Sequence, residues 1–402
     1  MPDFKETEFG TIPFEWKYIK GTEYCTKVTD GTHDSPKQVT HGKFLITSKH
    51  IKGRDIDFEN AYHISEDDYN KIISRSKVDQ WDVIISMIGE YCGFTYIERN
   101  PNPNYAVKNV GMFKTGSEHK AKWLHYYLNS RIGKAVLEAQ KTGTSQPYIT
   151  LGSLRNIEIL LPNSEDNLIA IAEVLSSLDD KIDLLHRNNK TLEEIAETLF
   201  RQWFVEGAKE DWEMGTLGEL VLVKRGGSPR PIQDFLSDSG LKWLKISDVT
   251  SVPSPYVFNI KEYIKEEGIK KTVLLKKGSL IVSNSATPGI PKILAVDSCI
   301  HDGWLYFPES QLSNEFLYLF FLKIKTELVS LGNGSIFTNL KTDIVKTFPI
   351  LKPDAQTLEK FDDIISPVFK KMYSNTVQLL SLTETRDVLL PKLMSGQVRV
   401  KH

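Results

Sequence analysis

Two stretches of this chain, 190 residues apart, carry the same apolar pattern, and each predicts a very long helix. Residues 166–204 read DNLIAIAEVLSSLDDKIDLLHRNNKTLEEIAETLFRQWF, and residues 356–394 read QTLEKFDDIISPVFKKMYSNTVQLLSLTETRDVLLPKLM. In both stretches apolar side chains recur every three or four residues, which places them on one face of a helix. A helix of about 40 residues extends for about 60 Å, far beyond the usual length in globular proteins.

A helix of that length needs a partner along its apolar face, and its own copy is the obvious one. We therefore predict that the two helices pack as an antiparallel coiled coil. Two unrelated amphipathic helices in separate cores are the alternative. The positions predicted to form the coiled-coil core are Ile171, Leu175, Leu178, Ile182, Leu192, Leu199, Phe361, Ile365, Val368, Met372, Leu382 and Leu389.

The correspondence continues upstream of both helices. GTSQPYITLGSLRNIEILLP at 143–162 parallels GSIFTNLKTDIVKTFPILKP at 334–353, since each has a Gly-polar turn, a short linking run and a strand-like run that ends at proline. Two Trp-led openings, WKYIKGTEY and WEMGTLGEL, also correspond. Each half therefore consists of a globular domain followed by a long helix.

The centres of the halves, 25–142 and 221–331, diverge in sequence, although both read as short strands and turns. DVIISMIG at 82–89 stands beside GSLIVSNSATPG at 278–289, and a helical stretch follows at 122–140 and at 314–331. The predicted fold class is α+β, with two β-rich domains, two long helices and an internal pseudo-twofold repeat. The predicted segments are domains 1–162 and 207–353 and helices 163–206 and 354–402.

Composition is that of an ordinary globular protein, with 402 residues, 40% of them hydrophobic and 25% charged. There is no apolar run near the ~20 residues of a membrane span and no signal-peptide pattern, so a cytoplasmic protein is expected. Cys25, Cys92 and Cys299 lie far apart, without a CxxC pair. They are expected to be buried thiols and argue against a disulfide framework or a structural metal.

The distribution of charge says more than the net charge of -2. Residues 1–162 hold 21 basic and 20 acidic side chains, and 207–353 hold 18 and 16, whereas 163–206 hold 4 and 10. DNA affinity depends on clustered cations that neutralise phosphates. Near-neutral domains therefore predict weak DNA binding by the chain alone, with a partner that supplies positive charge.

No catalytic motif stands out. Asn102-Pro103-Asn104-Tyr105 resembles the motif with which amino-methyltransferases hold the target amine, but Asn104 replaces the second proline and no Gly-rich S-adenosylmethionine loop follows a strand. We interpret it as a turn. Gly332-Asn333-Gly334 lacks the third glycine of a dinucleotide loop, and Walker A, Gly-x-Ser-x-Gly and HExxH patterns are absent from the sequence. Catalysis by this chain alone is not expected.

Several segments, in this order and duplicated, resemble the specificity subunit of type I restriction-modification systems. They are TLEEIAETLFRQWF (191–204) and LTETRDVLLPKLMSGQV (382–398), the Trp-led openings at 16 and 212, DGTHDSP (30–36), KRGGSPRP (224–231), WLKISD (243–248), SNSATPGIP (283–291) and CIHDGW (299–304). The resemblance covers nearly the whole chain.

The resemblance implies that two target-recognition domains each read half of an interrupted DNA site. The long helices, the family's central and distal conserved regions, would set the gap. Two modification subunits with adenine-N6 methyltransferase activity and bound S-adenosylmethionine would dock on the frame, and two restriction subunits that use ATP and magnesium are optional members. The chain itself would hold no cofactor or metal. A degenerate stand-alone methyltransferase and a coiled-coil DNA-binding regulator are the alternative functions.

The candidate DNA contacts lie in loops that combine Gly or Pro with Arg, Lys, Asn, Gln and hydroxyl side chains. Arg and Lys suit guanine, Asn and Gln suit adenine, and hydroxyls and backbone groups suit phosphates. In the first domain the candidates are Thr32, His33, Ser35, Lys37, Thr47, Ser48, Lys49, Gln146 and Tyr148. In the second they are Arg225, Gly226, Gly227, Ser228, Arg230, Lys245, Ser247, Asp248, Ser283, Asn284, Ser285, Thr287, His301 and Asp302. Trp243 and Trp304 are expected in the core.

Overall fold

The computed structural model describes residues 3–143, 145–332 and 340–400 of the chain. The chain divides into two compact units: the first unit comprises residues 1–182 and 381–402, and the second unit comprises residues 183–380. Both units are built of strands and helices, and both contain part of the long helices α6 (Glu165–Arg201) and α11 (Ala355–Met394). A π-helical turn, η2 (Gln202–Glu206), continues α6.

Two sheets form the centre of the first unit. One is antiparallel, with the strand order β4-β10-β7-β8, and the other has the order β6-β5-β9, in which β5 and β9 run parallel. Every residue of β7 is buried, because this strand lies inside its sheet and is covered on both faces. The strands are β4 (Lys27–Asp30), β5 (Lys43–Thr47), β6 (Tyr62–Ile64), β7 (Asp82–Ser86), β8 (Thr95–Ile97), β9 (Tyr105–Lys108) and β10 (Val110–Lys114).

Shorter elements surround these sheets. The hairpin β1 (Phe4–Thr7) and β2 (Gly10–Pro13) opens the described chain, and β3 (Lys17–Lys20) pairs with β11 (Glu158–Leu161). The helices are α1 (Gly21–Tyr24), η1 (Ser48–His50), α2 (Glu66–Ser76), α3 (Glu118–Asn129), α4 (Arg131–Gln140) and α5 (Leu151–Asn156).

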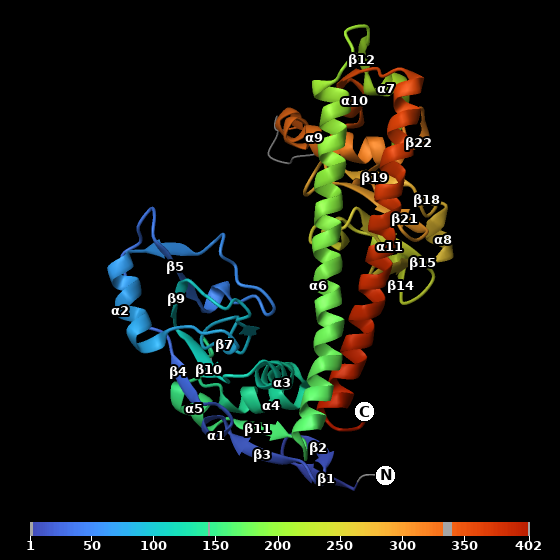
Figure 1. Cartoon of the computed structure of the whole chain (residues 1–402). Coiled ribbons are helices and arrows are strands. Elements are labelled where there is room, and N and C mark those ends of the chain that lie inside the picture. Colours follow the sequence, from blue (N-terminus) through green and yellow to red (C-terminus); the bar gives the residue numbers. More distant parts are fainter. Residues whose placement is uncertain (1–2, 144, 333–339, 401–402) are drawn as a thin grey trace. The chain divides into compact units, whose positions relative to one another are not determined.

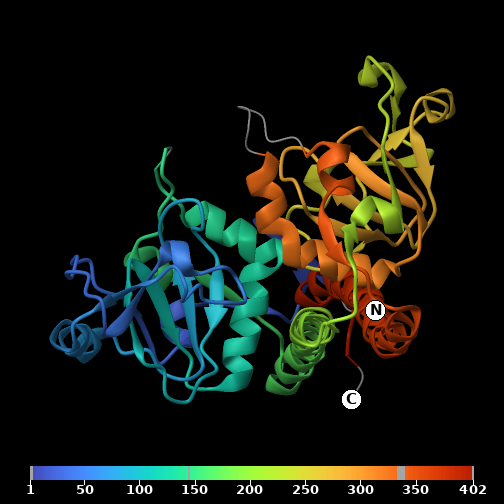
Figure 2. The same cartoon turned by 90° about the horizontal axis from the view of Figure 1, so that it is seen from above.

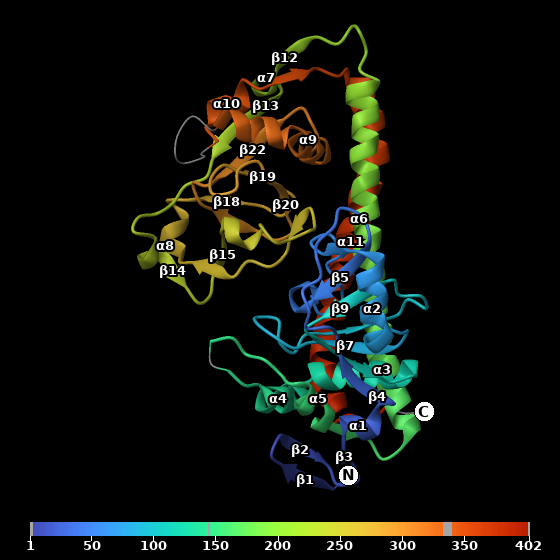
Figure 3. The same ribbon diagram turned by 90° about the vertical axis from the view of Figure 1, so that its left-hand side faces the viewer.

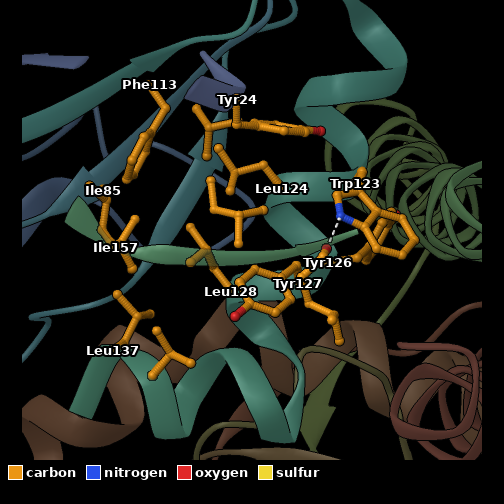
Figure 4. Packing of buried hydrophobic residues seen from close by; sticks show 14 of the residues in the cluster. Tyr24, Ile85, Phe113, Trp123, Leu124, Tyr126, Tyr127, Leu128, Leu137 and Ile157 are labelled. Atoms are coloured by element: carbon orange, nitrogen blue, oxygen red, sulfur yellow. Dashed lines mark hydrogen bonds between the residues drawn. The ribbon is translucent and has the colours of Figure 1, made fainter. Parts of the chain in front are cut away.

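Helix α3 packs between the four-stranded sheet and α6, as Figure 2 shows. Its buried face carries Trp123, whose indole N–H donates to the carbonyl of Leu160 at 2.9 Å (Figure 4). The single helical stretch expected at 122–140 is two helices, because the Ser130 hydroxyl accepts from the amide of Gly133 and caps α4. Only glycine fits there, since a Cβ at Gly133 would lie 1.9 Å from the carbonyl oxygen of Tyr127.

The second unit has the strand orders β13-β22-β19-β20-β16 and β14-β17-β15-β21-β18. Helix α9 (Asn314–Gly332) covers the first of these sheets (Figure 3). The strands are β13 (Val221–Arg225), β14 (Leu236–Ser237), β15 (Leu241–Leu244), β16 (Tyr256–Val257), β17 (Glu262–Ile264), β18 (Val273–Leu275), β19 (Leu280–Ser283), β20 (Pro291–Leu294), β21 (Ser298–Ile300) and β22 (Trp304–Ser310).

Several of the remaining elements of this unit match elements of the first unit. Strand β12 (Met214–Thr216) pairs with β23 (Pro349–Leu351), as β3 pairs with β11. The other helices are α7 (Leu217–Leu220), η3 (Ile232–Phe235), η4 (Ile246–Asp248), α8 (Glu266–Ile269) and α10 (Thr342–Lys346). The linking runs before β11 and β23 are the short helices α5 and α10.

The two centres, which diverge in sequence, share one topology. The order β4-β10-β7-β8 corresponds to β13-β22-β19-β20, and β6-β5-β9 corresponds to β17-β15-β21. The parallel pair β5–β9 reappears as β15–β21. The duplication therefore extends through the centre of each half, where the second unit adds the strands β14, β16 and β18. The sequence did not reveal the repeat in the centre of each half, because the fully buried strands β7 and β19 share only a general apolar character and the loops differ.

The long helices run antiparallel in each unit (Figure 1). In the first unit, Leu168 and Ile171 share a core with Leu393 and Met394, while Asp179 contacts Arg386. In the second unit, the amide of Asn375 donates to Asn189 at 2.9 Å, and Phe200 lies 6.1 Å from Phe361 between ring centroids. Residue numbers thus rise along one helix as they fall along the other, and the predicted antiparallel pairing is confirmed.

The predicted coiled-coil positions differ in burial. Ile171, Leu175, Ile182, Phe361, Ile365 and Met372 are buried, and Leu178, Leu192, Leu199, Val368, Leu382 and Leu389 are half-buried. Neighbouring positions are also buried, among them Phe200, Phe369 and the polar residues Asp179 and Asn375. A straight helix drifts relative to a seven-residue repeat, so the buried face moves off the predicted stripe.

All three cysteines are free and buried, as expected. Burial raises the pKa of Cys25 to about 12 and that of Cys299 to about 11, so both are protonated at neutral pH.

Among the described residues, no group of three or more His, Cys, Asp or Glu side chains is arranged to hold a metal ion. In the same part of the chain, no helix has the length and apolarity needed to cross a membrane.

We predict that His125 makes the first unit acid-sensitive. Burial lowers the pKa of this α3 histidine from 6.5 to about 4, although the charge of Asp179 opposes the shift. His125 therefore becomes protonated near pH 6.5 in the unfolded chain but only near pH 4 in the folded chain. Because the unfolded chain binds this proton more tightly, lowering the pH favours unfolding. Between pH 7.5 and 5 the wild type should lose about 2 kcal/mol more stability than His125→Gln in urea titrations. Parallel pH profiles for the two proteins would contradict this.

Candidate nucleic-acid interface

In the first unit, the loop that follows β4 lies against the turn that follows β9. The amide of Gly31 donates to the carbonyl of Val110 at 2.9 Å, and that of Thr32 donates to Val107 at 3.0 Å. A Cβ on Gly31 would lie 2.3 Å from the Val107 carbonyl oxygen, so the close approach requires glycine. The ring of His33 then reaches Asn109 Oδ1 and Asp30 Oδ2, each at 3.0 Å.

Three more segments join this loop through a chain of hydrogen bonds. The Ser48 hydroxyl, in η1, donates to the carbonyl of Asn109 at 2.6 Å and accepts from the amide of Met87 at 3.3 Å. The carbonyl of Met87 accepts from the amide of Ile149 at 2.9 Å, and Gly89 donates to Pro147. The loops at 30–37, 47–50, 86–94 and 142–149 therefore gather at one place. They carry Thr32, His33, Ser35, Lys37, Thr47, Ser48, Lys49, Gln146 and Tyr148.

The second unit repeats the close approach at the equivalent loop. The amide of Gly226 donates to Trp304 at 2.9 Å, and that of Gly227 donates to Ile300 at 3.3 Å. A Cβ on Gly226 would lie 2.2 Å from the carbonyl oxygen of His301. The two loops after β4 and β13 therefore share one constraint on their backbones, although they share few side chains.

Asp302 organises the side chains of the second loop. Its carboxylate accepts from the Ser228 hydroxyl at 2.8 Å and from Arg230 at 3.2 Å, and its carbonyl accepts from Arg225. Burial alone would raise the pKa of Asp302, but the Ser228 hydrogen bond and the charges of Arg225 and Arg230 outweigh it and lower the pKa. Burial lowers the pKa of His301. At neutral pH the cluster thus combines an anion, two cations and a neutral imidazole.

The remaining candidates of the second unit surround this cluster. Asn284 donates through its amide side chain to the Asp302 carbonyl at 3.2 Å, and its backbone carbonyl accepts from Leu340 at 2.7 Å. The charge of Lys245 adds to burial in lowering the pKa of His301, and Lys245 pairs with Glu262. The residues gathered here are Arg225, Gly226, Gly227, Ser228, Arg230, Lys245, Ser247, Asp248, Ser283, Asn284, Ser285, Thr287, His301 and Asp302.

Burial separates the candidates into three groups, and the half-buried group comprises Thr47, Gly226, Gly227, Ser228, Lys245, Ser285, His301 and Asp302. Five are buried, namely Thr32, Ser48, Asp248, Ser283 and Asn284. Ser283 shows why, since its hydroxyl donates to Thr287 and accepts from Ile290 within the same loop. These residues hold the loops. The exposed candidates are His33, Ser35, Lys37, Lys49, Gln146, Tyr148, Arg225, Arg230, Ser247 and Thr287.

Sequence reasoning missed Asn109, Lys108 and Arg75. Asn109 adopts a φ of 55° at the turn after β9 and binds His33, while Lys108 donates to Ser35 at 2.5 Å. Arg75, from α2, binds Asp30 at 2.7 Å. Asn109 lies in the turn between β9 and β10, which corresponds to the turn with His301 and Asp302 between β21 and β22. This correspondence alone could have identified Asn109 as a candidate, and it follows from the strand topology, which the sequence did not reveal.

Two interpretations of aromatic and turn residues are confirmed. Asn102 takes part in a turn before β9, where its amide donates to Asn100 Oδ1 at 2.9 Å. Tyr105 donates to the buried Glu98. Trp243 and Trp304 are buried, and the indole of Trp304 donates to Leu244 at 3.2 Å, so both tryptophans belong to the core.

Comparison with known proteins is consistent with this duplicated frame. The family model described as "Type I restriction modification DNA specificity domain" matches residues 38–194 and 209–383. The type I restriction enzyme MjaIX specificity subunit of Methanocaldococcus jannaschii is 24% identical over 100% of this chain and 97% of its own length. The HindI specificity subunit of Haemophilus influenzae is also 24% identical, over 65% of this chain and 73% of its own length.

A solved structure shares the fold. It is the S subunit of a type I restriction-modification system from M. genitalium, with a TM-score of 0.66 and 16% sequence identity. The match covers 98% of each chain.

We predict that Gly31→Ala destabilises the first unit, because the added methyl group would overlap the Val107 carbonyl. Such overpacking costs about 1–3 kcal/mol in the free energy of unfolding, which urea titration measures. Gly152→Ala is the matched control, since its nearest neighbour would be the Thr150 hydroxyl at 3.6 Å, an ordinary contact within α5. The control should be neutral or stabilising by up to about 1 kcal/mol. Equal stability of the two variants would show that the loop does not need this close approach.

Proposed function

We propose, for a chain that belongs to the family of type I restriction-modification DNA specificity subunits, that its two units each read one half of an interrupted DNA target. Specificity subunits supply DNA sequence recognition and are the non-catalytic components of their complexes. One observation carries the proposal of two half-sites. Two domains whose sheets share seven strands in the same order present their loops from equivalent positions, with different side chains on them.

The side chains of the loops would provide the reading. Arg225 and Arg230 can bind guanine edges or phosphates, and Gln146 can bind adenine. The glycine contacts at Gly31 and Gly226 fix the backbone from which these side chains project. Because the loop after β4 presents His33 where the loop after β13 presents arginines, the two half-sites should differ in sequence. We assign recognition to domains 1–162 and 207–353.

The long helices, in segments 163–206 and 354–402, would act as the spacer and the docking frame for two modification subunits. Leu184 and Ile195, 11 residues apart on α6, have exposed fractions of 41% and 44%. Eleven residues make about three helical turns, so both side chains lie on one face. On α11, Ile364, Val377 and Val388 are also exposed. Exposed apolar side chains along a helix support a protein partner.

The chemistry would come from these partners. The modification subunits would bind S-adenosylmethionine and methylate adenine N6, and restriction subunits, where present, would use ATP and magnesium. The near balance of basic and acidic side chains in 1–162 and 207–353 supports this dependence. Tight DNA binding needs clustered cations, and partners of opposite charge balance would supply them.

We predict that methylome sequencing will detect one split motif, with methylated adenines on both strands, when this chain is expressed with its modification subunit. The same modification subunit without this chain should leave no motif, since it would lack sequence recognition. An unchanged methylome in the presence of both proteins would refute the proposed function. Methylation by this chain alone would instead favour a stand-alone methyltransferase, and tight specific DNA binding without a partner would favour a regulator.

We also predict that recognition is modular. Replacing residues 25–142 with the same region of another specificity subunit should change one half of the motif and leave the other half and the gap intact. The reason is that the loops gathered in the first unit come from this region and the adjacent 142–149 segment. Replacing 221–331 is the reciprocal control. A change in both halves, or in the gap, would contradict separate reading by the two domains.

A further inference from the structure

A carboxylate is buried on the face of α6 that packs in the first unit. Asp179 has an exposed fraction of 3%, and the residue 190 positions later, Phe369, is fully buried in the second unit. The repeat thus replaces an apolar core residue with a charge in only one of its copies. Removing one partner of a buried ion pair is strongly destabilising, so a carboxylate at this buried position requires well-placed partners.

The partners of Asp179 come from three different elements. Tyr126 of α3 donates to Oδ2 at 2.8 Å, and Arg386 of α11 lies 3.2 Å from Oδ1. Arg54, in the loop after η1, contacts the same Oδ1. One side chain therefore joins α6 to the second long helix, to the helix under the sheet and to a loop of the recognition domain.

The Arg54 loop leads directly to the candidate DNA interface. Residues 51–57 are closed by a bridge between Ile51 and Ile56 and by a hydrogen bond of 2.8 Å from the amide of Asp57 to the carbonyl of His50. His50 belongs to η1, whose Ser48 holds the Asn109 turn. The path from Asp179 through Arg54 to the loops that carry Thr47 and Lys49 is thus a series of direct contacts.

In the second unit the loop after η4 is held by the Lys292 ammonium of β20, which donates to the carbonyls of Val252 and Ser254, and it reaches α11 through uncharged groups. The loop contacts α11 through Ser254 and Thr376, whose hydroxyls lie 3.3 Å apart. Tyr256, at the end of that loop, donates to the carbonyl of Phe369 at 3.1 Å. Both domains therefore fasten the equivalent loop to a long helix, the first through the ion pair of Arg54 with Asp179 and the second through hydroxyl and carbonyl groups.

We propose that Asp179 is a positioning residue that fixes the loop 51–57, and through it the η1 segment, on the helical frame, so that the first half-site is read accurately. This inference rests on the proposed function, since it concerns the selectivity of that DNA reading. It predicts an effect on the first half-site alone. The second half-site is read from a unit in which Phe369 stands at the position equivalent to Asp179, and in which the loop reaches α11 through hydroxyl and carbonyl groups.

The test uses the full complex of this chain with its modification subunit. Asp179→Asn should raise methylation of sites with one mismatch in the first half by about tenfold relative to matched sites, and leave mismatches in the second half and the gap unaffected. Asp180→Asn is the matched control, because Asp180 pairs with Arg99 at 2.7 Å and both side chains are about half exposed. An exposed pair contributes little, so this variant should behave as wild type.

Arg54→Gln provides a second variant that leaves the carboxylate with Tyr126 and Arg386, and it should reproduce the selective loss. Hydrogen exchange of amides 51–57 should rise in both variants, with 249–255 unchanged. Equal relaxation of both half-sites, or lower stability with unchanged selectivity and exchange, would overturn the proposal. A wild-type complex that methylates no split motif would instead refute the proposed function, while the exchange measurement would still test the connection from Asp179 to the loop.

Discussion

The antiparallel pairing of α6 with α11 is the constraint on which the other parts of the molecule depend. Each unit completes its core with a piece of both helices. Leu168 and Ile171 of α6 meet Leu393 and Met394 of α11 in the first unit, and Phe200 meets Phe361 in the second. The last residues of the chain therefore belong to the core of the first half. Neither half of the sequence contains a complete core by itself, although the sequence is a tandem repeat.

The sequence predicts those parts of the fold that are periodic and local. The two helices, their proline-led starts and the strands around Ile84 and Ile281 all follow from apolar spacing. The common topology of the centres could not be predicted. It depends on pairings such as the parallel contact of β5 with β9, which joins residues about 60 positions apart and leaves no periodic signal. The burial of Asp179 was not predicted either, since a carboxylate within a long helix is ordinarily solvated.

The same distinction between local features, which could be predicted, and long-range contacts, which could not, applies to the candidate interface. The loops that the sequence singles out for their glycine, proline and polar side chains do lie together in each unit, because glycine permits the close backbone approach seen at Gly31 and Gly226. The pairing of side chains inside the interface could not be predicted from the sequence. His33 binds Asn109, 76 residues away, and Ser228 binds Asp302, 74 residues away. Individual buried members such as Ser283 were grouped with exposed ones, because burial within a loop depends on which other loops surround it.

The two interfaces differ in how they hold charge, and this difference bears on how each would meet DNA. Around Asp302 the cations Arg225 and Arg230 already have an anionic neighbour, so a phosphate or a guanine edge must compete with a carboxylate for them. Part of the electrostatic gain on DNA binding is thereby offset within the protein. In the first unit the Asp30 carboxylate is shared between His33 and Arg75, while Lys49 is exposed beside the site. Both arrangements favour selectivity over affinity, which agrees with the proposed function, in which partners would contribute to DNA affinity.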